Sequence, residues 1–208
     1  FAFGSLRKWL PLPDGGFAGA ENPAEIFTRP ASSMPDFSAD FLAASAARAR
    51  GSGWEDFSER LFYAAEAKIS ARKKPGRMSA YSLETLSRLD VEKIAGRRLA
   101  AIRAFSEASR GNGFFEELTF ANGRSPGMFS ACCPVLKFRE TRVRDAVYAG
   151  LRERNMFAPI YWGGFGSASS PAARAESASL MCLPPHFADA EEEAEGICGF
   201  ILGLCSRA

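Results

Sequence analysis

The sequence predicts an α/β protein, and three observations support this class. Several stretches place apolar residues three or four positions apart, as on one face of a helix. Short apolar runs bounded by Gly or Pro alternate with these stretches, as buried strands do. The 208 residues are 47% hydrophobic and 24% charged, which is the composition of a globular protein with one or two cores.

The first twenty residues predict a strand, a loop, a tight turn and a second strand. Residues 1–4 form a short apolar run. Residues 10–13 alternate Leu and Pro, which forbids a helix. The Asp-Gly-Gly run at 14–16 is a strong turn signal, and residues 17–20 can leave it as a strand.

Helices dominate the middle of the chain. Asp36 or Ser38 can cap a helix that runs to about residue 50, and a second helix covers residues 54–71. The basic run at 72–77 can serve as an anion patch or as a solvated linker. The near-neutral net charge of +2 favours the linker.

A long helix from the cap Asp90 to about residue 110 follows one or two helical turns at 82–86. We expect it to end the first domain, so that the domains cover residues 1–110 and 111–208. The second domain should have its helices on one face of a small sheet. Its expected elements are strands at 128–138, 156–162 and 179–183, and helices at 141–155, ended by Asn155, and 189–205, capped by Asp189, with a loop at 163–173.

Charge and cysteine content exclude several classes of protein. The net charge of +2 gives no indication of a nucleic-acid or acidic-membrane partner. The longest apolar runs, such as residues 197–205, are far shorter than the roughly 18 residues that span a bilayer. The five cysteines have no CxxC spacing and the chain has one histidine, so no metal site is expected. Their apolar neighbours indicate buried free thiols in a reducing compartment, so we expect a cytoplasmic protein.

The segment at residues 5–16 carries the chemistry. Arg7 can hold a phosphate by charged, bidentate hydrogen bonds, and Ser5 can add a neutral donor. A cation beside a lysine favours the neutral, nucleophilic amine, and here Arg7 precedes Lys8 directly. A phosphate grip beside an activated lysine is what a pyridoxal-phosphate site requires. The four residues alone would more often be a surface basic pair.

The whole segment, SLRKWLPLPDGG, resembles the lysine loop of a group of pyridoxal-phosphate enzymes. These belong to the aspartate-aminotransferase superfamily (fold type I) and are related to the DegT-type sugar aminotransferases. In that group a Ser or Thr, an Arg and the cofactor lysine precede a Pro-Asp-Gly-Gly turn. Supporting matches are the Leu-Asp at 89–90 with Arg97 and Arg98, the strand end at 159–162, and the SLMCLP run at 179–184.

The resemblance implies a fold, an activity and a set of site residues. The chain would be the end of a large domain with a mostly parallel sheet, followed by a small α+β domain. Lys8 would bind pyridoxal 5'-phosphate covalently and move protons at the substrate, with Ser5 and Arg7 on the phosphate. The implied enzyme is a homodimeric aminotransferase that takes an amino donor and a keto acceptor, the acceptor being a nucleotide sugar or a polysaccharide precursor.

The chain departs from the group's pattern at two places. Tyr161 stands where the group has His, and Pro185-His186-Phe187 replaces an acidic and Arg-Tyr pattern. Substrate contacts from these positions are therefore not carried over. Trp9 and Trp162 can line an active site, although tryptophan more often packs in a core or an interface.

Alternatives stay open. The fold hosts amino-acid aminotransferases and lyases, and a non-catalytic member would keep the fold without the chemistry. A nucleic-acid module built on the basic run at 72–77 would bind with a steep salt dependence. Only seven residues precede Lys8, so we expect the partner of the pyridine nitrogen, the ring-stacking residue and the phosphate cup upstream. This piece alone is expected to be inactive.

Overall fold

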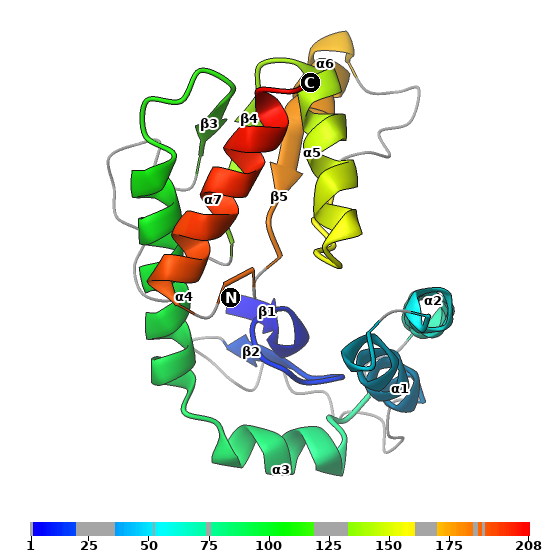
Figure 1. Ribbon diagram of the computed structural model, residues 1–208. Helices are drawn as coiled ribbons and strands as arrows, with labels where there is room; N and C mark the ends of the chain where they lie inside the picture. Colours follow the sequence, from blue (N-terminus) through cyan, green and yellow to red (C-terminus); the bar gives the residue numbers. More distant parts are fainter. Residues whose placement is uncertain are drawn as a thin grey trace. The chain divides into compact units, whose positions relative to one another are not determined.

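The computed structural model describes residues 2–19, 36–51, 53–73, 76–118, 133–160, 170–184, 187–188 and 190–208. Within these residues the chain forms seven α-helices and two small sheets, so the protein is mixed α/β (Figure 1). It divides into two compact units, Phe1–Leu89 and Asp90–Ala208. The sequence placed this boundary near residue 110. It falls earlier because the apolar face of the long helix, with Ile102 and Phe105, is part of the C-terminal core.

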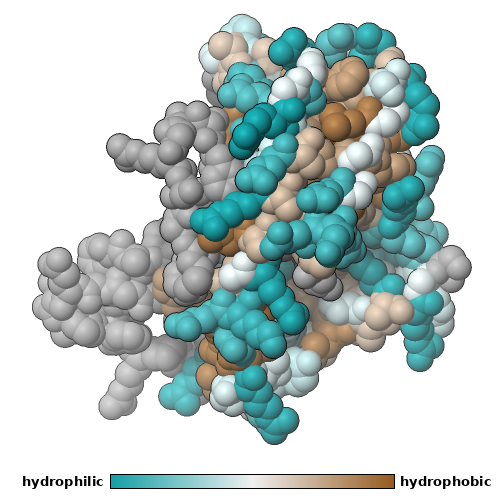
Figure 2. Space-filling model, turned by 60° about the vertical axis from the view of Figure 1, so that its left-hand side comes forward, coloured by the Kyte–Doolittle hydropathy of each residue, from teal (hydrophilic) through white to brown (hydrophobic). Residues whose placement is uncertain are grey.

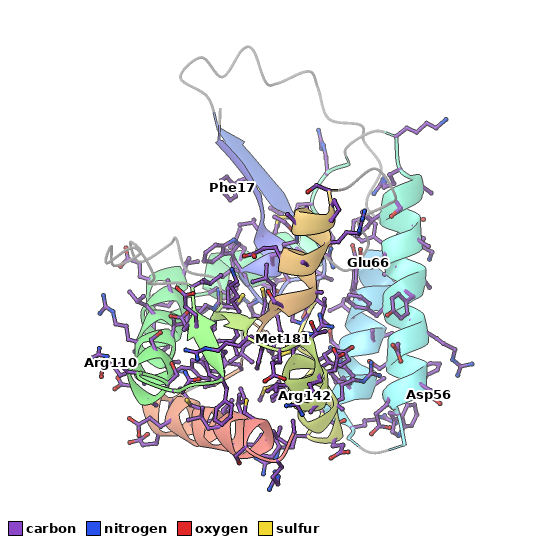
Figure 3. All side chains as sticks on the ribbon, turned by 90° about the horizontal axis from the view of Figure 1, so that it is seen from above. Phe17, Asp56, Glu66, Arg110, Arg142 and Met181 are labelled. Atoms are coloured by element: carbon purple, nitrogen blue, oxygen red, sulfur yellow. The ribbon has the colours of Figure 1, made fainter. Side chains whose placement is uncertain are left out.

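The N-terminal unit starts with two strands joined by a loop and a tight turn, as the first twenty residues predicted, and the structure pairs these strands as an antiparallel hairpin. Ser5 pairs with Gly16 and Gly4 with Phe17, and Phe17 remains about half exposed (Figure 3). A 3₁₀ helix at Leu6–Lys8 occupies the start of the connection. The elements of this unit are β1 (Ala2–Ser5), β2 (Gly16–Gly19), α1 (Ser38–Ala49), α2 (Glu55–Ala71) and α3 (Ala80–Arg88).

Helices α1 and α2 pack side by side (Figure 1). Phe41 and Ala44 of α1 and Ala65 of α2 are buried, which matches the apolar faces seen in the sequence. The Ser58 hydroxyl of α2 donates to the Ala44 carbonyl at 2.9 Å. Gly51 has a φ of +81°, so it ends α1 in the left-handed conformation that glycine adopts without strain.

The expected caps of α1 were wrong. The N-cap position is Phe37, and Ser38 is the first helical residue. The Ser38 hydroxyl donates instead to Asp14 at 2.6 Å, so a partner distant in sequence takes the group that would otherwise cap the helix.

Over the part that the structure describes, the C-terminal unit has four helices and a three-stranded sheet, and three of the helices share one hydrophobic core with the sheet. In Figure 1, α7 lies between α4 and α5 and contacts both. Met181 of the sheet, which Figure 3 labels, is fully buried. The hydrophobic core of this unit also holds Phe105, Leu151 and Ile201. The elements are α4 (Val91–Ala108), β3 (Phe115–Glu117), β4 (Val135–Phe138), α5 (Thr141–Glu153), α6 (Pro171–Ser179), β5 (Leu180–Cys182) and α7 (Glu191–Cys205).

This sheet has the order β3-β4-β5 and both pairings are antiparallel. Leu136 faces Met181, and Phe138 faces Phe115. Leu136 and Phe138 are buried and alternate with less buried residues, which is the pattern of a sheet with one covered face. The mostly parallel sheet expected for a large domain is not seen among the described residues, where every strand pairing is antiparallel.

The helices expected at 141–155 and 189–205 are confirmed as α5 and α7, and Asp90 caps α4 by accepting from the Lys93 N–H at 2.9 Å. Asn155 ends α5 with a φ of +57°, as expected. Asp189 lies outside the described residues.

The strand expected at 156–162 was wrong over its described part. Residues 156–160 form no strand, although the Pro159 carbonyl accepts from the Cys182 N–H at 3.1 Å. Pro159 has no N–H to continue a ladder. The strand expected at 128–138 is confirmed only over Val135–Phe138, and residues before 133 lie outside the described part.

Helix α6 occupies part of a stretch expected to be a loop. Ser170 accepts from the Ala173 N–H at 3.1 Å and Pro171 is the first helical residue. A serine cap followed by proline is a helix start signal that the sequence contained.

The surface drawn in Figure 2 is mainly hydrophilic, with small hydrophobic patches. No described helix has both the length and the apolar character that crossing a membrane requires.

Candidate functional site

The loop that carries Lys8 is folded by backbone hydrogen bonds and buried leucines. The Leu6 N–H donates to the Gly15 carbonyl at 3.1 Å, which closes the loop at its base. The Leu6 carbonyl accepts from the Leu10 N–H at 2.8 Å. Leu10 and Leu12 are buried, and the prolines between and after them prevent a helix. The Leu-Pro alternation therefore anchors the loop in the N-terminal unit.

Both glycines of the Asp-Gly-Gly turn are required by the geometry. Gly15 has a φ of +108°, and a Cβ there would lie 2.8 Å from the Met78 side chain. A Cβ on Gly16 would lie 2.9 Å from the Gly4 carbonyl oxygen. Any larger residue would therefore strain the turn or push the hairpin strands apart.

Asp14 connects this turn by hydrogen bonds to the start of α1 and to the start of α3. Its carboxylate is 2% exposed and accepts from the Ser38 hydroxyl at 2.6 Å, the Ser79 hydroxyl at 2.6 Å and the Ser79 N–H at 2.9 Å. Burial raises the pKa of Asp14, but the hydrogen bonds from Ser38 and Ser79 outweigh it and leave the pKa below its usual 3.8. Asp14 is therefore an ionised structural residue.

Arg7 is held between an acid and an aromatic ring. Its Nη1 donates to the Glu66 carboxylate at 2.9 Å, and its guanidinium lies 4.3 Å from the centre of the Phe41 ring. The Arg7 and Glu66 side chains are 23% and 38% exposed (Figure 3 labels Glu66). The ion pair uses one nitrogen, so the guanidinium keeps further N–H donors.

Lys8 and Ser5 flank Arg7 in different settings. Lys8 is exposed at the end of the 3₁₀ helix, which has about three residues per turn, so Arg7 and Lys8 leave it about 120° apart. Ser5 is extended at the N-cap position, and its hydroxyl makes no capping hydrogen bond. The three residues predicted to act together therefore occupy one short turn.

A pocket of about 550 Å³ lies against this turn in the N-terminal unit. Ser5 and Arg7 line it, as the sequence predicted for a phosphate grip. Lys8 is not among its lining residues. Residues of the loop between α2 and α3 also line the pocket. The polar residues that line the pocket are Ser5, Arg7, Asp14, Arg72, Lys73 and Arg77.

Arg72, Lys73 and Arg77 line this pocket, whereas the sequence favoured a solvated linker for their run and left an anion patch as the alternative. The run alone gives no sign of its neighbour. Only the closure of the hairpin loop against the start of α3, through Asp14 and Ser79, brings it beside Arg7.

A second pocket, of about 620 Å³, lies in the C-terminal unit near the end of α4, where Figure 3 labels Arg110. Its lining mixes cations and carboxylates, and Lys137 already pairs with Glu176 at 2.7 Å. None of the site residues predicted from the sequence lines it. It is therefore the weaker candidate.

The remaining sequence candidates give little further chemistry. Trp9 is half-buried, while Tyr161, Trp162 and His186 lie outside the described residues. The described cysteines are buried free thiols, and burial raises the pKa of Cys198 and of Cys205 to about 11, which keeps them unreactive. Among the described residues no cluster of three metal-ligating side chains occurs.

Comparisons with known proteins give no relative from which a role could be transferred. No family model matches the chain, and no curated protein or solved structure is significantly similar to it.

Proposed function

We propose that this chain carries the cofactor lysine of a pyridoxal-phosphate-dependent transferase, with Lys8 as that lysine. The observation that carries the proposal is the placing of Ser5 and Arg7 in one basic pocket, with Lys8 exposed on the same turn. The SLRKWLPLPDGG segment supplies the resemblance to the aspartate-aminotransferase superfamily.

The chemical types of these residues match the two reactive ends of the cofactor, although Lys8 does not line the pocket that holds Ser5 and Arg7. Pyridoxal phosphate has an aldehyde, which an exposed lysine amine can attack, and a phosphate, which Arg and Ser can bind. The Arg7 guanidinium keeps donors beyond the one used by Glu66, and the Ser5 hydroxyl is not engaged in capping. Ser5 and Arg7 would therefore hold the phosphate end, and Lys8 would hold the aldehyde end.

When bound, the cofactor supplies an electron sink for reactions at the α-carbon of an amino acid. Lys8 would hold and move the proton at that carbon. The reaction proposed is amino transfer to a nucleotide sugar or polysaccharide precursor in a cytoplasmic homodimer. Amino-acid transamination and lyase chemistry use the same residues and are the alternatives within this class.

A second candidate is a non-catalytic member that keeps the fold. The observation that favours it is the engagement of Arg7 with Glu66 and Phe41, which gives the arginine a structural role without any ligand. The two candidates differ in whether a cofactor binds Lys8.

The test is a visible absorption spectrum of the full-length protein with pyridoxal phosphate, followed by borohydride reduction and peptide mapping. We expect a visible band that is absent in Lys8→Ala, and a cofactor label fixed on Lys8. The control is Lys68→Ala, which removes a lysine that is paired with Asp40 at 2.7 Å and should keep the band. A label on Lys68 or Lys93, or no label at all, would rule out the assignment.

A further inference from the structure

The loop between α2 and α3 gives the pocket beside Arg7 a strongly positive lining. Arg7, Arg72, Lys73 and Arg77 all contribute to it, and Asp14 is its one carboxylate among the described residues. These cations come from two chain segments about 65 positions apart. Bringing like charges together is unfavourable unless an anion or solvent compensates them.

The carboxylates of Asp14 and Glu66 do not neutralise Lys73 and Arg77. Both oxygens of Asp14 are used by hydroxyl and N–H donors of Ser38 and Ser79. Glu66 pairs with Arg7. Lys73 and Arg77 are exposed and form no ion pair with any described residue. The charges of Lys73 and Arg77 are therefore available to a ligand.

One of the loop cations is positioned by packing. The Arg72 guanidinium lies 5.7 Å from the centre of the Phe37 ring, a residue that also lines the pocket. Arg7 is positioned in the same way by Phe41. A guanidinium group that contacts an aromatic ring has fewer conformations to lose when a ligand binds, which lowers the entropic cost of binding.

The size and composition of the pocket select the ligand class. A volume of about 550 Å³ falls within the roughly 300–1,000 Å³ of small-molecule sites and exceeds what one inorganic anion fills. A phosphate monoester has about two negative charges and three acceptor oxygens, which several Arg and Lys side chains can share. A nucleic acid would need an extended basic surface, and the net charge of the chain is only +2.

We infer that this pocket is a binding site for a small phosphorylated molecule, with Arg72, Lys73 and Arg77 as its charged ligands beside Arg7. The site does not require Lys8, so it goes beyond the proposed function. The phosphate can belong to the cofactor or to a phosphorylated substrate, and the experiment below separates the two sources.

The experiment is calorimetric titration of the full-length protein with inorganic phosphate at constant ionic strength. We expect Arg77→Ala to weaken phosphate binding about ten- to a hundredfold, the usual cost of losing a charged hydrogen bond. Arg77→Lys should retain part of the affinity because it keeps the charge. Arg60→Ala, which removes an exposed arginine of α2 outside the pocket, should leave the affinity unchanged. Circular dichroism melts confirm that each variant is folded.

Competition assigns the source of the phosphate. Titration of Lys8→Ala should give the same phosphate affinity as the wild type, even if the cofactor proposal fails. If pyridoxal phosphate displaces inorganic phosphate while pyridoxal does not, the site takes the cofactor phosphate. If both bind together, it takes the phosphate of a substrate. Unchanged phosphate affinity in the Lys73→Ala/Arg77→Ala double variant, or equal losses in Arg77→Ala and Arg60→Ala, would overturn the inference.

Discussion

Asp14 binds Ser79, which lies 65 positions later, through two hydrogen bonds. The Ser79 N–H donates at 2.9 Å and its hydroxyl at 2.6 Å. Ser79 is also the N-cap of α3, where its hydroxyl oxygen accepts from the Ser82 N–H at 3.1 Å. One buried carboxylate thus connects the turn after Lys8 to the end of the basic loop, and the pocket lies between the two segments.

Replacing Asp14 should therefore destabilise the protein. We expect Asp14→Asn to lower the free energy of unfolding by about 2–4 kcal/mol, because a buried group that accepts three hydrogen bonds loses its charge. Urea denaturation measures the change. Asp36→Asn, the same substitution at an exposed residue, should stay within about 0.5 kcal/mol. A loss as small as that of Asp36→Asn would show that the network contributes little.

The contribution of Asp14 should depend on pH. Its pKa is lower in the folded protein than its usual 3.8, so between the two values the unfolded chain binds more protons. The stability that Asp14 supplies is complete above about pH 4 and is lost as the pH falls through its folded-state pKa. The difference between wild type and Asp14→Asn should therefore shrink from pH 7 to pH 3. A difference that stays constant or grows in acid would contradict the assignment.

Gly15 should be hard to replace. We expect Gly15→Ala to destabilise the protein by more than the about 1–3 kcal/mol of its backbone strain, since its Cβ would also lie 2.8 Å from Met78. Gly53→Ala is the matched control, with a φ of +91° and no atom within 4 Å of the added Cβ. Thermal melts of both variants, and of Gly15→Ala with Met78→Ala, separate strain from contact. Equal losses of stability in Gly15→Ala and Gly53→Ala would show that the contact with Met78 contributes nothing.

Arg7→Met separates the two roles of Arg7. Methionine keeps an unbranched stem on Phe41 but has no charge. We expect pyridoxal-phosphate affinity to fall about ten- to a hundredfold. The free energy of unfolding should fall by at most about 1 kcal/mol, the value of a partly exposed ion pair. Arg88→Met, which breaks the exposed pair with Glu84, should leave the affinity unchanged. Unchanged affinity with a lower melting temperature would mark Arg7 as structural.

Signals within a few residues of one another predicted much of the fold. Periodicity, caps and glycine predicted strands β1 and β2, helices α1, α2, α4, α5 and α7, and the helix ends at Gly51 and Asn155. These signals succeed because a helix or a turn is decided by hydrogen bonds between near neighbours. Where a distant group competed, they failed, as at Ser38, whose hydroxyl goes to Asp14.

Some features of the candidate site follow from local sequence signals, and others depend on the tertiary structure. The sequence by itself determined the turn that carries Ser5, Arg7 and Lys8, because prolines, buried leucines and the Asp-Gly-Gly turn shape that loop locally. Only the tertiary structure decided that the basic loop lies beside Arg7 and that the described strands pair antiparallel. Pairing and convergence depend on contacts between segments far apart in sequence, and no local pattern encodes which segments meet.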